Sequence, residues 1–189
     1  MLVLAAITAC SNPSGSDVLL MTEEEKNIIE ETNSVRTNPQ GYAAMLQAEL
    51  SGIYNSETIA AYNAAIATLN AAAPRAPVYF EKGLYLAAGD HADDLIKTGK
   101  FSHDSSNGKS FGDRIKLYGT SYTYAGENIA AGTYQNTGSK VVKQWVLSPG
   151  HLGNILNTNF TQIGAVLKPG HPTYNWISVQ VFARGFVSN

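Results

Sequence analysis

Three side chains far apart in the sequence have the chemistry expected of a polar site. His103 lies in a segment expected to be a loop just after a helix, and His151 lies in the first turn of a helix that Ser148 caps. Unpaired N–H groups in such a turn keep an imidazole neutral, the form that binds metals or accepts protons. Glu127 lies in an apolar strand segment, residues 126–129, where burying a carboxylate without a partner is costly.

Spacing alone leaves three interpretations of these side chains open. Two neutral imidazoles and a carboxylate suit a divalent metal ion such as zinc. The same groups suit acid and base chemistry on a bound water. They could equally do no more than tie loops together. His103, Glu127 and His151 are therefore candidate site residues with these three possible roles.

The other histidines, and the serine next to His103, favour structural interpretations. His91 lies on the apolar face of a helix and is expected in the core, whereas His171, beside Pro172 in a hairpin loop, is expected in solvent. Ser102 adjoins His103, but adjacent residues on an extended loop point apart. The sequence has no Gly-x-Ser-x-Gly elbow either, so a serine hydrolase is not expected.

Apolar spacing predicts the elements that position these residues. Thr22 and Glu25 form a capping box that starts a helix running to about Arg36, and Asn38-Pro39 breaks it. The further elements are predicted as helices over 42–50, 59–69, 84–98 and 139–147, a helix starting at 148–149, a loop over 101–119, a strand over 122–131, and an antiparallel hairpin of 163–167 and 177–182 joined by 169–172. Helices followed by strands mixed with short helices make an α+β order.

Length and composition exclude several classes. The 189 residues are 44% hydrophobic and 15% charged, which is enough apolar material for one full core and suggests one domain. The net charge is −2, and no block of basic residues is present, so nucleic acid is not expected as a partner. The single cysteine excludes a disulfide framework and a cysteine-based zinc site.

The N-terminus resembles a bacterial lipoprotein signal. Residues 1–9 are apolar and shorter than the roughly 20 residues that cross a bilayer, and they end at Cys10. In that class the cysteine thiol is lipidated and becomes the new N-terminus. The alternatives are an ordinary signal peptide and a buried apolar start. We expect a signal peptide over 1–9, a lipidated Cys10 with a flexible tether over 10–21, and a folded domain over 22–189.

Several motifs in the folded region occur together and in a fixed order. They are Phe101-Ser-His103-Asp, Gly126-Glu127-Asn-Ile-Ala, Trp145, Ser148-Pro-Gly-His151-x-x-Asn154-Ile-Leu, Ile163-Gly-Ala, Val179-Gln-Val-Phe182, and Asn33, Arg36 and Tyr42 near the start. In this combination the chain resembles the CAP superfamily of cysteine-rich secretory proteins, antigen 5 and plant pathogenesis-related proteins. The resemblance covers roughly residues 22–189. The short Ser-Pro-Gly-His link and the lack of cysteine pairs resemble the bacterial branch.

The resemblance implies a fold and a site. The fold is an α+β, three-layer α-β-α sandwich with a small central antiparallel sheet. The implied cleft is lined by His103, Glu127 and His151, with Ser148 and Asn154 from the same motif as His151. Eukaryotic relatives carry a second glutamate at the position of Ser148, so a mechanism that needs two carboxylates is in doubt. Relatives bind zinc or other divalent ions through the two histidines, which makes His103 and His151 the metal candidates.

The expected function is an extracytoplasmic, membrane-anchored binding module of the bacterial cell envelope. It would be non-catalytic, with a His/Glu cleft able to hold a divalent metal, and Cys10 would attach it to the membrane. The ligand would be a lipid, an envelope component or a host molecule. The alternative is a metal-dependent peptide or ester hydrolase, in which metal-activated water attacks and Glu127 acts as base.

Overall fold

The computed structural model describes residues 21–134 and 136–189. The expected signal peptide, Cys10 and all but the last residue of the tether lie outside the described residues. The helices are α2 (Glu23–Thr37), α3 (Pro39–Leu50), α4 (Ser56–Ala71), α5 (Lys82–Thr98), α6 (Phe111–Ile115), α7 (Gly138–Val146) and α8 (Pro149–Ile155). The strands are β1 (Tyr79–Phe80), β2 (Gly119–Ser121), β3 (Tyr124–Gly132), β4 (Gln162–Pro169), β5 (Trp176–Arg184) and β6 (Val187–Ser188).

The main sheet has four strands in the order β1-β4-β5-β3. The predicted hairpin of β4 and β5 is confirmed, and β3 pairs with β5 in the antiparallel sense as well. The two-residue β1 pairs with β4 in parallel, so the sheet is mixed and not wholly antiparallel. β2 and β6 form a separate two-stranded ladder. Within the described part of the chain, β3 therefore ends the main sheet, and no strand pairs with its outer edge.

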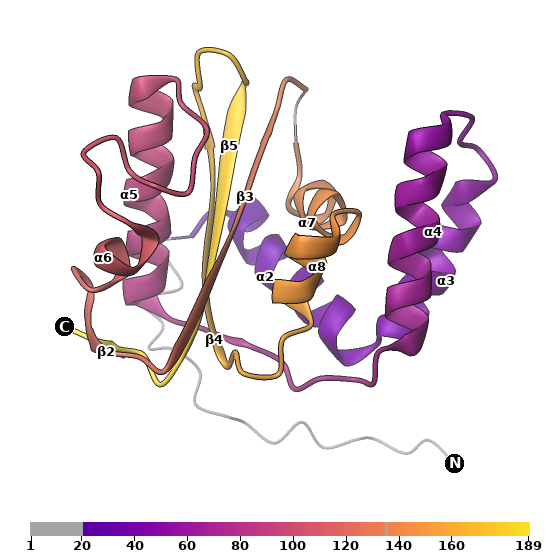
Figure 1. Ribbon diagram of the computed structural model, residues 1–189, viewed down its shortest axis with the longest axis horizontal. Coiled ribbons are helices and arrows are strands. Elements are labelled where there is room, and N and C mark those ends of the chain that lie inside the picture. Colours follow the sequence, from indigo (N-terminus) through magenta and orange to yellow (C-terminus); the bar gives the residue numbers. More distant parts are fainter. Residues whose placement is uncertain (1–20, 135) are drawn as a thin grey trace.

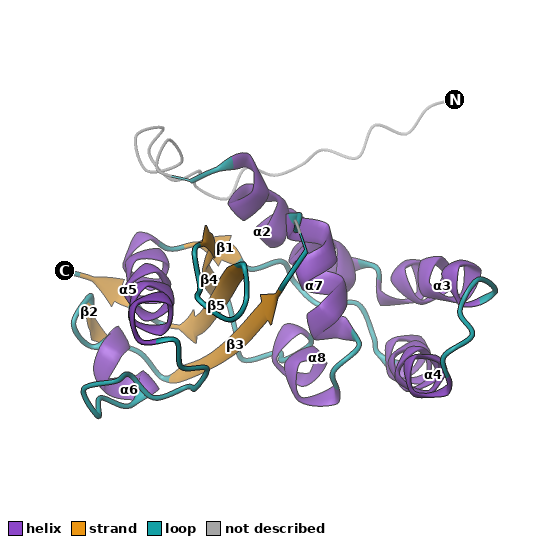
Figure 2. Ribbon diagram, turned by 90° about the horizontal axis from the view of Figure 1, so that it is seen from above, coloured by secondary structure: helices purple, strands orange, loops and turns teal. Residues whose placement is uncertain are grey.

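Helices cover both faces of this sheet, which confirms the predicted α+β sandwich (Figure 1). α5 packs on one face, and α2, α7 and α8 pack on the other (Figure 2). The α3–α4 hairpin packs against α2 and α8 on the side away from the sheet, so it forms an outer addition to the three layers. Each face of the sheet buries its own apolar cluster.

The start of α2 shows how the sequence fixes an element and its neighbours. The predicted capping box is present, with the Thr22 hydroxyl accepting from the N–H of Glu25 and the Glu25 carboxylate accepting from the N–H of Thr22. At the other end, the buried Arg36 guanidinium donates to the carbonyls of Ile155 and Phe160. α2 is thereby joined to the last residue of α8 and to the segment that follows it.

One glycine sets how closely α5 approaches the sheet. A Cβ built on Gly164 of β4 would lie 2.1 Å from the backbone nitrogen of Tyr85 and 2.3 Å from the carbonyl carbon of Leu84. Any side chain at this position would push the first turn of α5 outward. The absence of a side chain is therefore what permits the contact between α5 and β4.

The segment 101–119 is not a loop throughout, which corrects the prediction from sequence. Ser110 and Asp113 form a capping box that starts the short helix α6, with the Ser110 hydroxyl accepting from the N–H of Asp113. The serine and the acid three residues later were the available signal. α6 follows the loop that carries His103, and it places Arg114 in the interior.

Candidate polar site at the edge strand β3

Glu127 occupies the middle of β3 with its side chain on the face covered by α5. Alternate residues of a strand share a face, and Ile129, two positions on, belongs to the apolar cluster on the α5 side. The Glu127 side chain is 2% exposed. A carboxylate so deeply buried must be compensated by cations and hydrogen-bond donors.

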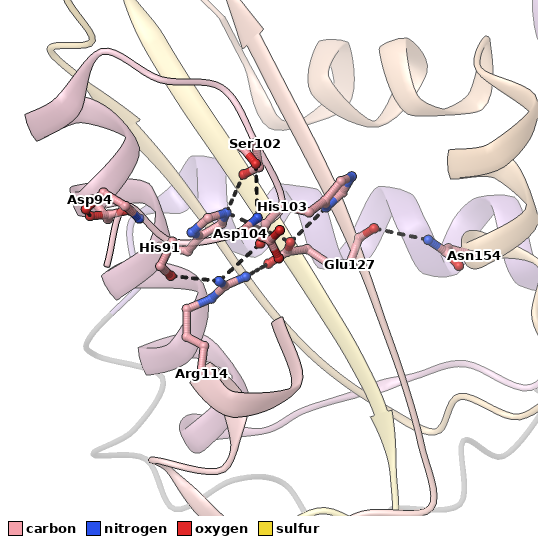
Figure 3. A network of polar contacts seen from close by, with 10 residues as sticks. His91, Asp94, Ser102, His103, Asp104, Arg114, Glu127 and Asn154 are labelled. Atoms are coloured by element: carbon pink, nitrogen blue, oxygen red, sulfur yellow. Dashed lines mark hydrogen bonds and ion pairs between the residues drawn. The ribbon is translucent and has the colours of Figure 1, made fainter. Parts of the chain in front are cut away.

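Two partners hold the two oxygens of this carboxylate (Figure 3). The His103 ring, through Nδ1, lies 2.9 Å from Oε1, and Arg114 donates from Nη2 to Oε2 at 2.5 Å. His91 lies farther off, with its Nε2 3.9 Å from Oε1. Of the partners, His103 is the one in contact with solvent, since its side chain is 55% exposed. Glu127 is therefore covered, while His103 lies at the surface.

Arg114 is the site residue that the sequence analysis missed. Its side chain is 4% exposed, and besides Glu127 it contacts the His103 loop, donating to the carbonyl of His103 and to the hydroxyl of Ser105. The guanidinium also stacks over the Phe111 ring at 5.7 Å. The need of the buried Glu127 carboxylate for a cation indicated that a basic partner exists. No sequence pattern indicated that this partner is Arg114 of α6.

Two side chains of α5 form hydrogen bonds to the loop that carries His103. The predicted core position of His91 is confirmed, since its side chain is fully buried, and its Nε2 donates to the carbonyl of Ser102 at 2.8 Å. Asp94 accepts from the backbone N–H of Ser106 and from its hydroxyl. Together with Arg114, these contacts fix the loop on both sides of His103 (Figure 3).

His151 approaches from the opposite layer, on α8. Asn154, one turn further along this helix, donates to the carbonyl of Glu127 at 3.1 Å and to the side chain of Asn128 at 2.8 Å. Asn128 in turn donates to the buried Gln180. Ser148 is the N-cap residue of α8 as predicted, but its side chain makes no capping hydrogen bond. The side-chain amide of Asn154 therefore joins α8 to β3.

The three histidines nearest the carboxylate differ in charge preference. The hydrogen bond to Glu127 raises the pKa of His103. Burial, followed by repulsion from His103, lowers the pKa of His151. Burial lowers the pKa of His91. The neutral His151 expected from its helical turn is thus favoured, with burial and His103 as the causes.

A metal ion needs several donor atoms that can reach one point. Among residues 21–134 and 136–189, no group of three or more His, Cys, Asp and Glu side chains is placed to share an ion. The His103 Nδ1 and both Glu127 oxygens are engaged with each other and with Arg114. What is left for a metal is the second ring nitrogen of His103 and the imidazole of His151. Two imidazoles are fewer ligands than the three or four protein ligands typical of zinc sites.

His171 is not solvated, contrary to the expectation. It is 4% exposed, and its Nδ1 accepts from the backbone N–H groups of Thr173 and Tyr174 while its Nε2 donates to the carbonyl of Lys100. The ring satisfies the backbone of its own loop, which a loop sequence does not reveal. His171 therefore has a structural role, joining its loop to the end of the segment that follows α5.

The sequence is similar to one protein family and to two proteins of Bacillus subtilis. The sequence model of the cysteine-rich secretory protein family, CAP, matches residues 29–182. Over 88 residues the chain is 43% identical to uncharacterized protein YkwD of Bacillus subtilis (strain 168), covering 47% of this chain and 34% of that protein. Over 87 residues it is 32% identical to uncharacterized membrane protein YlbC of the same strain, covering 46% of this chain and 25% of that one. The match spans about a third or less of these relatives.

Two solved structures share the fold. An extracellular protein containing an SCP domain from Bacillus anthracis str. Ames aligns with a TM-score of 0.52 and 29% identity, over 58% of this chain and 34% of that one. An outer surface protein from Borrelia burgdorferi aligns with a TM-score of 0.52 and 24% identity, over 70% of this chain and 96% of that one.

None of the described helices has the length and apolar character needed to cross a membrane.

Proposed function

The chain belongs to the CAP family of cysteine-rich secretory proteins, and on that premise we propose that it is an extracytoplasmic binding module whose two-histidine face holds a divalent metal ion. Its location outside the cytoplasm is supported by its likeness to a protein described as extracellular. The ligand class that suits an ion bound by imidazole is an oxygen or nitrogen donor that completes the coordination.

The observation that carries this proposal is the burial of Glu127 between Arg114 and His103. An ionised carboxylate only accepts hydrogen bonds, so the proton of the His103 ring lies on Nδ1. When the ring is neutral, the lone pair then lies on Nε2, where a metal would bind. A carboxylate behind a ligating histidine fixes its orientation and increases its basicity. Glu127 therefore supports a ligand and is not itself needed as one.

His103 and His151 would hold the ion, and their different layers would place it at the edge of β3. Imidazole ligands favour zinc, copper and nickel over calcium and magnesium, which prefer oxygen. When bound, the ion would act as a Lewis acid that attracts a carboxylate or phosphate group of a ligand. With two protein ligands the ion is held weakly, which suits reversible binding.

The hydrolase alternative is less well supported. It needs Glu127 to take a proton from a bound water, whereas the Glu127 side chain is 2% exposed and both its oxygens are occupied. A general base must reach the proton that it abstracts. Glu127 is better suited to hold His103 and Arg114 in place.

Calorimetric titration with zinc tests the metal site. Near pH 7.5 the unmodified protein is expected to bind zinc, and His103→Asn and His151→Asn are each expected to weaken binding at least about tenfold, the effect of losing one ligand or its support. Binding should also be lost near pH 5, where imidazoles protonate. Asn63→Ala, an exposed position on α4, is the matched control, and calcium is the control ion.

The outcomes of this experiment are distinct. Zinc binding that survives loss of either histidine would contradict the proposal. So would hydrolysis of peptide or ester libraries that requires both zinc and Glu127, since that result would establish the hydrolase instead. Binding of calcium as tightly as zinc would show an oxygen site elsewhere and would also overturn the assignment to His103 and His151.

Attachment to the membrane through Cys10 is the second part of the proposal. Its support is the apolar run that ends at this cysteine, the one cysteine in the sequence. Cys10→Ser is expected to move the protein from the detergent phase to the aqueous phase in detergent partitioning of expressing cells, while Ser11→Ala should leave it in the detergent phase. A Cys10→Ser protein that stays in the detergent phase would contradict lipidation.

A further inference from the structure

A second candidate site lies at the C-terminal end of β3, away from Glu127. It is a cavity of about 390 Å³ lined by Tyr134, Asn136, Leu167, Pro169, Asn175 and Trp176. Trp176 pairs with Gly132 at the end of β3, five residues from Glu127, which is about 17 Å along a strand. The Trp176 ring also belongs to the apolar cluster on the α2 and α7 face, the opposite face to Glu127. The two sites are therefore separate.

The rim of this cavity is held in place by side chains of β5 and of the turn before it. The indole N–H of Trp176 donates to the carbonyl of Tyr134 at 2.7 Å, and the Asn175 amide donates to the carbonyl of Thr133. These bonds anchor the backbone on which Tyr134 stands. The Tyr134 side chain is nonetheless 87% exposed, so its ring is displayed beside the cavity and not packed into the core.

The polar groups of the lining are uncharged and partly unused. Asn136 accepts from the N–H of Thr137 through Oδ1, and its amide N–H₂ makes no hydrogen bond to the described residues. Asn175 uses its amide N–H₂, which leaves Oδ1 as an acceptor. The cavity therefore presents an amide donor, an amide acceptor and a phenol hydroxyl next to Leu167 and Trp176.

This combination selects a class of ligand. A charged ligand would meet no countercharge among the described lining residues, and a purely apolar ligand would leave the two amides without partners. A sugar ring has apolar C–H faces that pack on aromatic rings and hydroxyl groups that pair with amides. The volume lies at the lower end of the range for small-ligand sites, roughly 300–1,000 Å³. We infer that this cavity binds an uncharged pyranose unit of a glycan.

The test is titration with chitotriose and with maltotriose, both neutral oligosaccharides, followed by NMR of the indole N–H groups. The sequence has two tryptophans, and Trp145 is fully buried, so the Trp176 resonance reports on the cavity. At least one of the sugars is expected to shift that resonance in a saturable manner. Chelator is present throughout, so the result does not depend on the metal site.

Variants of the exposed ring separate stacking from other effects. Tyr134→Ala is expected to raise the dissociation constant about tenfold, and Tyr134→Phe by no more than about twofold, because the ring face supplies most of the contact. Tyr54→Ala is the matched control, since Tyr54 is 91% exposed and lies outside the cavity lining. It should bind like the unmodified protein.

Three results would overturn the inference. The first is no shift of the Trp176 resonance with either sugar at millimolar concentration. The second is a shift that Tyr134→Ala and Tyr54→Ala reduce equally, which would show non-specific association. The third is a saturable shift with decanoate but with neither sugar, which would establish an apolar ligand in place of a glycan.

Discussion

Arg114 and Glu127 form an ion pair in which both partners are almost wholly buried. The Arg114 Nη2 lies 2.5 Å from the Glu127 Oε2, and the two side chains are 4% and 2% exposed. The pair joins the five-residue helix α6 to the edge strand β3. Because α6 is too short to be stable by itself, it depends on tertiary contacts such as this ion pair and the burial of Ile115 beside α5.

Loss of the arginine should be the most damaging change at the site. Arg114→Met leaves the Glu127 carboxylate buried without its cation, and we expect a loss of about 3–5 kcal/mol in the free energy of unfolding, measured with urea. The double variant Arg114→Met/Glu127→Gln removes the buried charge and should recover part of that loss. A double variant as unstable as the single one would show that the charge is not the cause.

The pKa values of His103 and His151 should be shifted in opposite directions from that of an ordinary histidine. We expect the pKa of His103 to lie above 6.5 because Glu127 favours its charged form, and the pKa of His151 to lie below 6.5 because of burial and His103. Proton NMR of the ring C–H signals measures both. Glu127→Gln should lower the pKa of His103. Equal midpoints for the two rings in the unmodified protein would contradict the described contacts.

His91 should make the fold sensitive to acid. Burial lowers its pKa from 6.5, so below that pH the unfolded chain takes up a proton that the folded chain does not bind. This contribution to stability is complete above pH 6.5 and decreases as the pH falls. His91→Gln keeps a donor for the carbonyl of Ser102 and should flatten the fall in melting temperature between about pH 7 and pH 5. An unchanged slope would contradict this assignment.

The amide contacts between α8 and β3 should stabilise the site measurably. Asn154→Ala removes the hydrogen bonds to the carbonyl of Glu127 and to Asn128, and it should cost about 1–3 kcal/mol. Urea unfolding measures the cost, and Asn63→Ala on the exposed face of α4 is the control. The His151 resonances should broaden or move in Asn154→Ala alone. Equal stability of the two variants would show that the contacts contribute nothing.

Two glycine substitutions should have opposite signs. Gly164→Ala forces its new methyl group to within 2.1 Å of the backbone nitrogen of Tyr85, and we expect a loss of about 1–3 kcal/mol in stability. Gly153 lies inside α8 with open space at its Cβ, so Gly153→Ala should gain about 0.5–1 kcal/mol through helix propensity. Thermal unfolding distinguishes them. A tolerated Gly164→Ala would show that α5 moves freely over the sheet.

Sequence patterns predicted the helices and strands that are determined by interactions between residues close in sequence. The capping box at Thr22 and the alternation in β4 and β5 operate within a few residues, and both were confirmed. β1 has only two residues, and its pairing with β4 depends on chain packing, so no periodicity could indicate it. The capping box of α6 was readable, but it lay in a segment rich in turn residues.

The site was predictable in part for the same reason. Sequence motifs brought His103, Glu127 and His151 together as candidates, and the structure places His103 on Glu127. The need of Glu127 for a cation could be stated, yet the choice of Arg114 depends on how α6 packs. The burial of His171 depends on the carbonyl of Lys100, 71 residues away, which no loop pattern encodes.

The position of β3 at the end of the sheet has a consequence for how copies of the chain meet. An outer strand offers unpaired backbone groups to any strand of another molecule, which is a route to aggregation. Asn154 already occupies the carbonyl of Glu127, at the middle of that strand. The helix that carries His151 thus covers part of this border, which opposes strand addition by a second copy at that point.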